Sequence, residues 1–219
     1  MKKILVLASL VIAMIAAAGL VKSTGAFENN KQNGIISAQY DSFYCKAMDL
    51  PKQDISSEER DMLLFMIEEE KMAHDVYSYL YAKWQLKPFS NISRAEKRHV
   101  QSIEAMLNKY GFANPVKNMN EGEFTNAEIN KLYALLIEQG NRSLIDALKA
   151  GAEIEEVDIA DLNTAIGKTD NDDLKMVFNN LKRASGNHLR AFMRNIERRG
   201  ESYAPKHLDE TEFNKYLKK

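Results

Sequence analysis

The stretch RAEKRHVQSI, residues 94–103, places Glu96 and His99 three residues apart in a pattern that predicts an amphipathic helix. Glu96 falls in line with the apolar positions of this helix, and His99 lies on their flank. Charged groups are rarely buried unless they are paired or bind a metal. The function of the chain therefore depends on whether other helices bring similar groups to the same place.

The apolar pattern is helical almost throughout residues 54–219, and no stretch alternates as a strand would. Helix start and stop signals predict four long helices, at about residues 57–84, 93–110, 143–166 and 171–199. A shorter helix is expected at about residues 126–139, and a last one after Pro205. Long helices joined by modest connections are typical of a four-helix bundle. We therefore predict an all-α fold, a four-helix bundle with the extra short helix between its second and third long helices.

The other three long helices also interrupt their apolar faces with polar residues. A helix advances about 100° per residue, so that Glu70 points at the core, whereas Glu68 points away and Glu69 lies to the side. Among the three glutamates of the third long helix, the same geometry selects Glu155, and His188 lies at the centre of the fourth apolar face. Each long helix therefore offers at least one inward group that can bind a metal.

Together, these positions would bring three carboxylates and two imidazoles into the interior of the bundle: Glu70, Glu96, His99, Glu155 and His188. A carboxylate and a histidine at i, i+3, with glutamates from facing helices, is how bundle-core di-iron and di-manganese sites are assembled. The carboxylates can bridge two cations, and the metal charge offsets the cost of burial. A hydrogen-bonded polar core is the alternative. We favour the metal site because five unsatisfied polar groups would strongly destabilise a core.

Other polar residues fit such a site less well. His74 lies at the edge of the first apolar face, where it either faces solvent or contacts a metal ligand. We interpret Tyr77 as a core aromatic residue rather than as a hydrogen-bonding partner of a ligand. Glu153 turns away from the core, and His207, which lies beyond the last long helix, is expected to be exposed.

Residues 1–26 are typical of a secretory signal peptide, because Lys2 and Lys3 precede an apolar run at 4–21 that small residues follow. An uncleaved N-terminal anchor is the alternative, since the run is long enough to span a bilayer. Both interpretations predict an exported chain that is periplasmic, secreted or associated with the cell envelope. Membrane contact is expected only through this N-terminal segment, if it is uncleaved. We predict that residues 27–53 form a polar linker and that residues 54–219 form the helical domain.

The composition narrows the range of partners and of chemistry. The formal net charge is −1, and no basic stripe dominates a predicted face, so we do not expect a nucleic acid as partner. Cys45 is the only cysteine, which excludes an intrachain disulfide and a cluster of thiolate metal ligands. There is no glycine-rich phosphate loop and no arrangement typical of a nucleophilic triad.

The motifs of the helical region also resemble a known family. EERDMLLFMIEEEKMAHDVY (58–77), SLIDALKAGAEIEEVDIADL (143–162) and ESYAPKHL (201–208) are similar to the ferritin-like family catalogued as domain of unknown function 2202, and the resemblance covers about residues 54–218. It implies a ferritin-like four-helix bundle in a family grouped with di-iron carboxylate proteins. Glu70 and Tyr77, as parts of an E-x-x-A-x-x-x-Y motif, resemble the first helix of rubrerythrins, which supports Glu70 as a ligand.

One position departs from the pattern of di-iron proteins, whose last helix carries a second E-x-x-H. Here Ser185 precedes His188 by three residues, and a serine cannot bridge metals as a carboxylate does. We hypothesise that Asp158, one turn after Glu155, supplies the missing oxygen ligand.

We therefore expect a metal-binding protein, with iron as a di-iron pair as the expected metal and manganese or zinc as alternatives. The expected chemistry is a reaction with O₂ or peroxide, such as that of a ferroxidase or a peroxidase. The alternative is a non-catalytic metal-binding or cell-envelope scaffold module on the same fold. The sequence does not define the substrate or the oligomeric state.

Overall fold

The computed structural model describes residues 46–218, and within this part of the chain there are helices and no strand. The helices are α2 (Ser57–Trp84), α3 (Lys87–Tyr110), α4 (Ala127–Arg142), α5 (Leu144–Lys168), α6 (Asp172–Glu197) and α7 (Glu210–Leu217). Residues 46–49 add a short helical turn. The predicted all-α class is confirmed. No described helix is both long enough and apolar enough to cross a membrane.

The start of α2 agrees with the predicted range, whereas the start of α3 does not. Ser56 caps α2, and Glu59 returns a hydrogen bond to the Ser56 backbone. The predicted start of α3 at residue 93 is wrong, because the helix begins at Lys87 with Pro88 in its first turn. Proline is tolerated there, since the first helical N–H groups have no intrahelical acceptor to lose.

Helix α4 continues through Gly140 to Arg142, although a glycine at this place predicts a helix end. A Cβ at Gly140 would lie 2.5 Å from Leu80 Cδ2, so the glycine allows α4 to approach α2 closely. Trp84 Nε1 donates a hydrogen bond to Gly140 O over 2.9 Å at the same contact. The glycine here therefore serves packing rather than termination.

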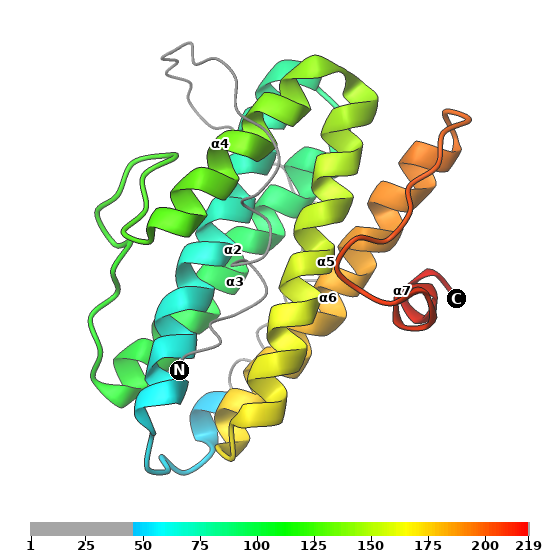
Figure 1. Cartoon of the computed structure of the whole chain (residues 1–219). Helices are drawn as coiled ribbons and strands as arrows, with labels where there is room; N and C mark the ends of the chain where they lie inside the picture. Colours follow the sequence, from blue (N-terminus) through cyan, green and yellow to red (C-terminus); the bar gives the residue numbers. More distant parts are fainter. Residues whose placement is uncertain (1–45, 219) are drawn as a thin grey trace.

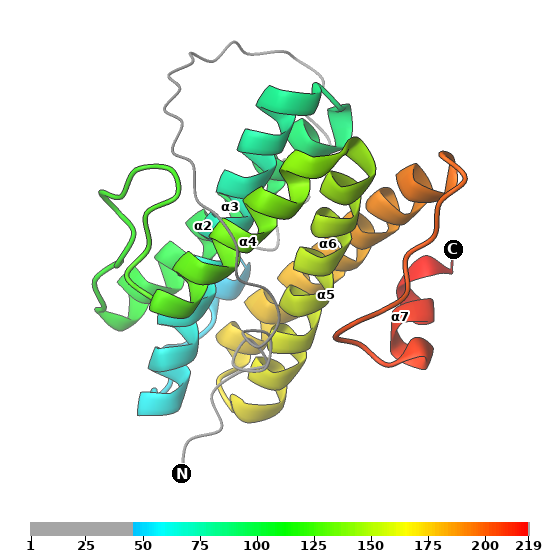
Figure 2. The same cartoon turned by 45° about the horizontal axis from the view of Figure 1, so that its top comes forward.

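Four long helices, α2, α3, α5 and α6, lie side by side and enclose a common interior (Figures 1 and 2). α2 packs most extensively against α3 and α5 against α6, and contacts between α2 and α5 and between α3 and α6 close the arrangement. α4 lies against α2 and α5, and α7 against α6. Helix α4 therefore covers the side of the molecule opposite α3 and α6.

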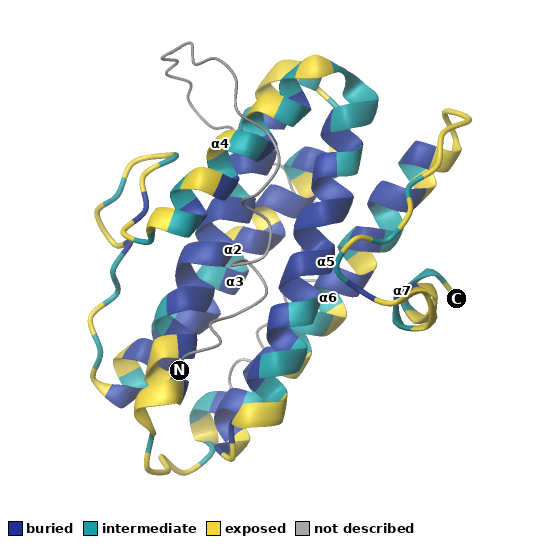
Figure 3. Ribbon diagram, in the orientation of Figure 1, coloured by how far each residue is buried: buried dark blue, intermediate teal, exposed yellow. Residues whose placement is uncertain are grey.

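The interior has two apolar clusters with a polar layer between them. One cluster gathers Tyr77, Leu80, Phe89 and Phe192, and the other gathers Leu63, Met66, Ile103 and Phe178. Both clusters are built from residues 47–217, so the helical domain contains its own core. The middle segments of α2 and α5 are buried in Figure 3, and the polar residues of all four helices lie between the two clusters.

Residues 46–53, within the predicted linker, lie against the helices. Ala47 is buried, and Lys109 Nζ donates hydrogen bonds to Ala47 O over 3.2 Å and to Leu50 O over 2.8 Å. The predicted signal peptide at 1–26, the rest of the predicted linker and Cys45 lie outside the described residues.

Candidate metal centre

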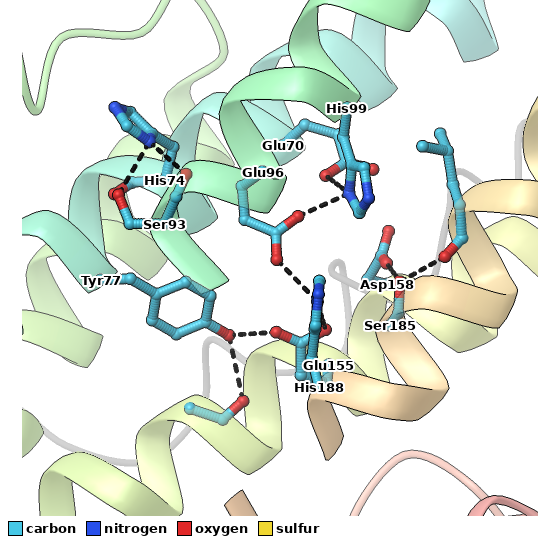
Figure 4. A network of polar contacts seen from close by, with 12 residues as sticks. Glu70, His74, Tyr77, Ser93, Glu96, His99, Glu155, Asp158, Ser185 and His188 are labelled. Atoms are coloured by element: carbon cyan, nitrogen blue, oxygen red, sulfur yellow. Dashed lines mark hydrogen bonds and ion pairs between the residues drawn. The ribbon is translucent and has the colours of Figure 1, made fainter. Parts of the chain in front are cut away.

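All four long helices contribute to the polar layer (Figure 4). Each ligand predicted from the sequence lies in it: Glu70 on α2, Glu96 and His99 on α3, Glu155 on α5 and His188 on α6. The side chain of His188 is 12% exposed, and the other four are at most 3% exposed. The structure therefore brings together the five residues that the helical periodicity selects.

Glu96 is shared between two overlapping groups of ligand atoms. Its Oε2 lies 2.6 Å from His99 Nδ1, and its Oε1 lies 2.9 Å from His188 Nδ1. Glu70 Oε2 completes the first group at 3.1 Å from His99 Nδ1, and Glu155 Oε2 completes the second at 3.4 Å from His188 Nδ1. In each group the ligand atoms all lie within 4.8 Å of one another, close enough to hold one metal ion. The two imidazole rings lie side by side, with centroids 5.7 Å apart.

The shared carboxylate is held in its charged form by the two imidazoles. Burial opposes the charge of Glu96, but His99 and His188 outweigh burial and lower its pKa. Burial likewise opposes the charge of both imidazoles, yet Glu96 and Glu70 raise the pKa of His99, and Glu96 and Glu155 raise that of His188 to about 10. Without a metal, Glu96 and the two imidazoles therefore stabilise one another's charged forms.

The remaining carboxyl groups of the layer resist ionisation. Burial raises the pKa of Glu70 to about 7, although His99 partly offsets the effect. Burial also raises the pKa of Glu155, and it raises that of Asp158 strongly, with Glu70 and Glu155 adding to the shift. The layer thus holds more buried carboxyl groups than its two imidazoles can neutralise, and added cations would be stabilised here.

Tyr77 contacts a predicted ligand directly. Its hydroxyl donates to Glu155 Oε1 over 2.5 Å and lies 3.2 Å from Gly151 O, while its ring packs against Phe89 and Phe192. The interpretation of Tyr77 as a packing residue alone is therefore wrong. Its hydroxyl fixes the orientation of Glu155, as groups behind metal ligands do.

Asp158 lies in the polar layer but in neither group of ligand atoms. Ser185 Oγ donates to Asp158 Oδ2 and also lies 2.9 Å from Leu181 O, while Asp158 Oδ1 is buried without a hydrogen-bond partner. Ser185, which stands where di-iron proteins carry a second bridging carboxylate, thus binds Asp158. The hypothesis that Asp158 is a ligand stays a prediction.

Glu68 and Glu69, the two glutamates that directly precede Glu70, are also buried, which the helical wheel does not predict. Glu68 is expected to point away from the core, but it is only 4% exposed. Thr125 Oγ1 donates a hydrogen bond to its carboxylate, and the backbone N–H of Asn126 donates another over 2.9 Å. Glu69 is 2% exposed, and burial together with Asp161 raises its pKa. The segment that leads into α4 covers the flank of α2 on which Glu68 lies.

The C-terminal segment covers the outer glutamates of α5 in the same way. Glu153 accepts a hydrogen bond from Lys206 Nζ over 2.5 Å, and His207 Nε2 lies 3.5 Å from its Oε1. Glu156 binds the hydroxyl of Tyr203 and the backbone N–H groups of residues 206–208. The predictions that Glu153 turns to solvent and that His207 is exposed are wrong, since these side chains are 7% and 8% exposed.

His74 does not contact a ligand. Its Nδ1 lies 2.8 Å from Ser93 O and therefore carries the proton, because a carbonyl oxygen only accepts. In Figure 4 its ring points away from Glu96. It lines a cavity of about 360 Å³ outside the polar layer, between α2, α3 and the connection to α4.

Comparisons with known proteins identify one family model, one relative and one solved structure. The family model described as "Uncharacterized protein domain (DUF2202)" matches residues 59–219. The chain is 46% identical to the uncharacterized protein MJ0754 of Methanocaldococcus jannaschii over 168 residues, which cover 77% of this chain and 91% of that protein. The crystal structure of hypothetical protein MJ0754 matches with a TM-score of 0.76 at 46% identity, over 77% of this chain and 97% of that chain.

Proposed function

The chain belongs to the DUF2202 family, and we propose that it is an exported ferritin-like four-helix-bundle protein that holds two metal ions in its core. Glu70, Glu96 and His99 would hold one ion, and Glu96, Glu155 and His188 the other. Iron is the proposed metal, with manganese or zinc as alternatives, since carboxylate and imidazole ligands accept all three.

The observation that carries this proposal is the position of Glu96. Its two oxygens face different imidazoles, and each oxygen belongs to a separate group of potential ligands. A carboxylate between two such groups is suited to bridge two cations. A purely hydrogen-bonded core would satisfy every polar atom, whereas Glu70 Oε1 and Asp158 Oδ1 are buried without a hydrogen-bond partner.

A bound pair of iron or manganese ions would supply redox chemistry toward O₂ or peroxide, of the ferroxidase or peroxidase type. The chain itself orients the ligands and limits the access of water. Tyr77 fixes Glu155 through its hydroxyl, and the two apolar clusters enclose the layer from both ends. The partly exposed side chain of His188 marks the thinnest wall of the layer.

Elemental analysis of the protein from residue 27 onward tests the proposal. We expect about two iron or manganese ions per chain, and their loss in the variant Glu96→Ala/His99→Ala. A metal-free wild type that gains no stability from iron, manganese or zinc would overturn the metal site. If metal binds but O₂ and peroxide are not consumed, the protein binds metal without redox turnover.

Ser185 favours this second function, a metal-binding or scaffold module without turnover. Its hydroxyl, which donates to Asp158, stands where a bridging carboxylate would complete a symmetric pair of sites. Consumption of O₂ or peroxide by the metal-loaded protein, lost with Glu96→Ala, would exclude this alternative.

A further inference from the structure

A cavity of about 360 Å³ lies outside the polar layer, between α2, α3 and the connection of residues 111–126. Asn114 Nδ2 donates a hydrogen bond to Glu104 Oε1 over 3.1 Å, and the Gly122 N–H donates one to Asp75 Oδ2 over 2.9 Å. These contacts fix the connection on α3 and on α2. Connections longer than about 12–15 residues are uncommon in compact domains unless they are functional or disordered. The anchored connection therefore forms a third wall, and its length indicates a function for the space behind it.

The wall that α2 gives to the cavity presents hydrogen-bond acceptors. His74 lies in this wall, and because its Nδ1 carries the proton that Ser93 O accepts, its Nε2 is an acceptor in the neutral ring. Asp75 is buried, and it uses Oδ2 both for Lys71 Nζ, over 2.5 Å, and for the Gly122 N–H. Its Oδ1 therefore keeps its lone pairs for a further donor.

The buried cation in the same wall is already engaged. Lys71 Nζ donates to Asn120 O over 2.8 Å in addition to its contact with Asp75. It also lies 4.6 Å from the centre of the Phe124 ring, so that its three N–H donors have partners. Lys71 therefore shapes the wall and leaves the acceptors beside it available to a ligand.

Glu121 adds a third acceptor next to this wall. Its carboxylate makes no hydrogen bond or ion pair with the residues that the structure describes. Partial burial raises its pKa, and the nearby charge of Asp75 adds to the shift, although His74 and Lys71 partly offset it. A positively charged group with several N–H donors would therefore be stabilised by Glu121, Asp75 and His74 together. Among the described residues, these three are not a group whose ligand atoms lie close enough to hold one metal ion, which favours an organic ammonium group.

The rest of the lining combines exposed cations with apolar side chains. Lys97 on α3 and Lys117 on the connection line the cavity, and both residues are exposed. Neither forms an ion pair within the described part of the chain. Val100, Val116 and Met119 add apolar surface. The formal charges of the lining cancel, since three cations accompany three anions: Lys71, Lys97 and Lys117 with Asp75, Glu104 and Glu121.

We propose that the cavity binds a small zwitterion, a molecule that carries an ammonium group and a carboxylate on a short apolar frame. The ammonium group donates to His74, Asp75 and Glu121. The carboxylate binds Lys97 and Lys117, and the apolar part contacts the three apolar side chains of the lining. A ligand without net charge matches a lining without net charge, and the volume lies within the range of small-molecule sites, about 300–1,000 Å³. None of the five proposed metal ligands lines the cavity, so this site does not depend on a bound metal.

The test is isothermal titration calorimetry of the protein from residue 27 onward, without added metal, with four probes. Leucine carries both charges at one carbon, beside an apolar side chain, whereas 5-aminopentanoate carries them at opposite ends of an apolar chain. Pentylamine and pentanoate keep one charge each. We expect at least one of the two amino acids to bind once per chain with a Kd of about 1 mM or tighter. The two singly charged probes should bind about tenfold more weakly, because each loses the charge-assisted hydrogen bonds of one end.

Two variants locate the binding of the ammonium group and of the frame. Glu121→Gln removes a negative charge from an exposed side chain of the lining and should weaken binding about tenfold. Its matched control is Glu123→Gln on the same connection, because Glu123 binds Asn120 and does not line the cavity. Val100→Phe fills part of the cavity and should abolish binding. Circular dichroism checks that each variant folds.

A third variant locates the binding of the carboxylate. Lys97→Gln/Lys117→Gln removes both exposed cations of the lining and should weaken the binding of the amino acid about tenfold, without changing that of pentylamine. Its matched control, Lys131→Gln/Lys149→Gln, removes the same charge from α4 and α5, where each lysine pairs with a glutamate outside the cavity.

Several results would overturn the proposal. One is that neither amino acid binds at about ten times the expected Kd, and another is that pentylamine or pentanoate binds as tightly as the better amino acid. Equal weakening in the matched controls, or undiminished binding in folded Val100→Phe, would place the ligand elsewhere and overturn it too. If Val100→Phe does not fold, the charge variants decide, because they change exposed side chains only.

Discussion

The substitution Glu96→Gln tests the centre of the polar layer, because it keeps the shape of the side chain and removes its charge. Glu96 is the only residue that belongs to both groups of potential ligands among the described residues. Its Oε2 lies 2.6 Å from His99 Nδ1 and its Oε1 lies 2.9 Å from His188 Nδ1. The change therefore affects the metal-free network and both proposed metal positions at once.

In the metal-free protein, the magnitude follows from the two buried partners that lose their counter-charge. Removing one partner of a buried ion pair costs about 3–5 kcal/mol. For a domain of this size, that corresponds to a fall in Tm of about 6–20 °C. The lowered pKa of Glu96 gives the sign, because it shows that the charged form is favoured in the fold.

In the presence of metal, a second difference arises. A metal at a hundred times its Kd stabilises the wild type by about 2.7 kcal/mol per site. The variant should lose this gain at both positions, since an amide cannot bridge two cations as a carboxylate does. The assay is urea unfolding in chelator and in excess ferrous iron or manganese, followed by circular dichroism.

Glu68→Gln provides the matched control on α2, since Glu68 is also a buried carboxylate but binds Thr125 and a backbone N–H instead of a histidine. Its variant should lose stability equally with and without metal. A full metal-dependent gain in Glu96→Gln, or its loss in Glu68→Gln as well, would refute the role of Glu96 at both metal positions.

Three further predictions concern the surroundings of the layer. Tyr77→Phe removes the hydrogen bond to Glu155; a metal titration should show about 10- to 100-fold weaker binding. Gly151→Ala would place a Cβ 2.6 Å from the ring of Phe192, which is itself packed against other aromatic rings, and urea unfolding should show a loss of about 1–3 kcal/mol. Burial opposes the charge of Glu153, yet hydrogen bonds from the segment before α7 lower its pKa. A lowered pKa stabilises the fold above the unfolded value of about 4.5, and urea unfolding between pH 7 and pH 3 should show this stability being lost as the pH falls through the folded value.

The tyrosine and glycine changes each have a control in the same helix, and the pH prediction has a variant that removes the titrating group. Tyr81 lies one helical turn after Tyr77, and the variant Tyr81→Phe should leave metal binding unchanged. Gly167→Ala meets no atom within 4 Å and should be neutral or stabilising by up to about 1 kcal/mol. Glu153→Gln should remove part of the loss of stability at acid pH. A wild-type metal affinity in Tyr77→Phe, or equal effects of the two glycine changes, would contradict the packing described above.

The sequence predicts the five inward polar residues of the layer because helical periodicity determines which residues share a face. Glu70, Glu96, His99, Glu155 and His188 interrupt apolar stripes that long helices must bury, so the fold places them together with little dependence on the connections. The end of α4 and the start of α3 are less predictable. Glycine often ends a helix, but Gly140 lies within α4 because it allows a close contact with α2. Proline often interrupts a helix, but Pro88 lies in the first turn of α3, where it is tolerated.

Periodicity fails for the glutamates on the flanks of the same helices. A helical wheel gives the direction of Glu68 and Glu153, but their burial depends on what covers that direction. The connection before α4 covers the first, and residues 201–208 cover the second. These covering segments are not helical and have no repeat, so the hydrophobic pattern carries no signal for them. The tyrosine, lysine and histidine of ESYAPKHL, which can bind carboxylates, are the one hint in the sequence, and they name no partner.

The replacement of a bridging carboxylate by Ser185 makes the two proposed metal positions unequal in a definite way. Ser185 donates its proton to Asp158 Oδ2, so that this aspartate has only Oδ1 left to offer a cation. The proposed metal position at Glu155 and His188 can therefore gain at most one additional oxygen from Asp158. Its histidine, His188, is also more exposed than His99. The position of Glu70 and His99 lies deeper and keeps both oxygens of Glu70 within the layer. Buried carboxylates with raised pKa values gain most from a cation, because the metal relieves both desolvation and mutual repulsion. The position at Glu70 should therefore fill first, and the position at His188 should remain the one open to exchange with ligands from solvent.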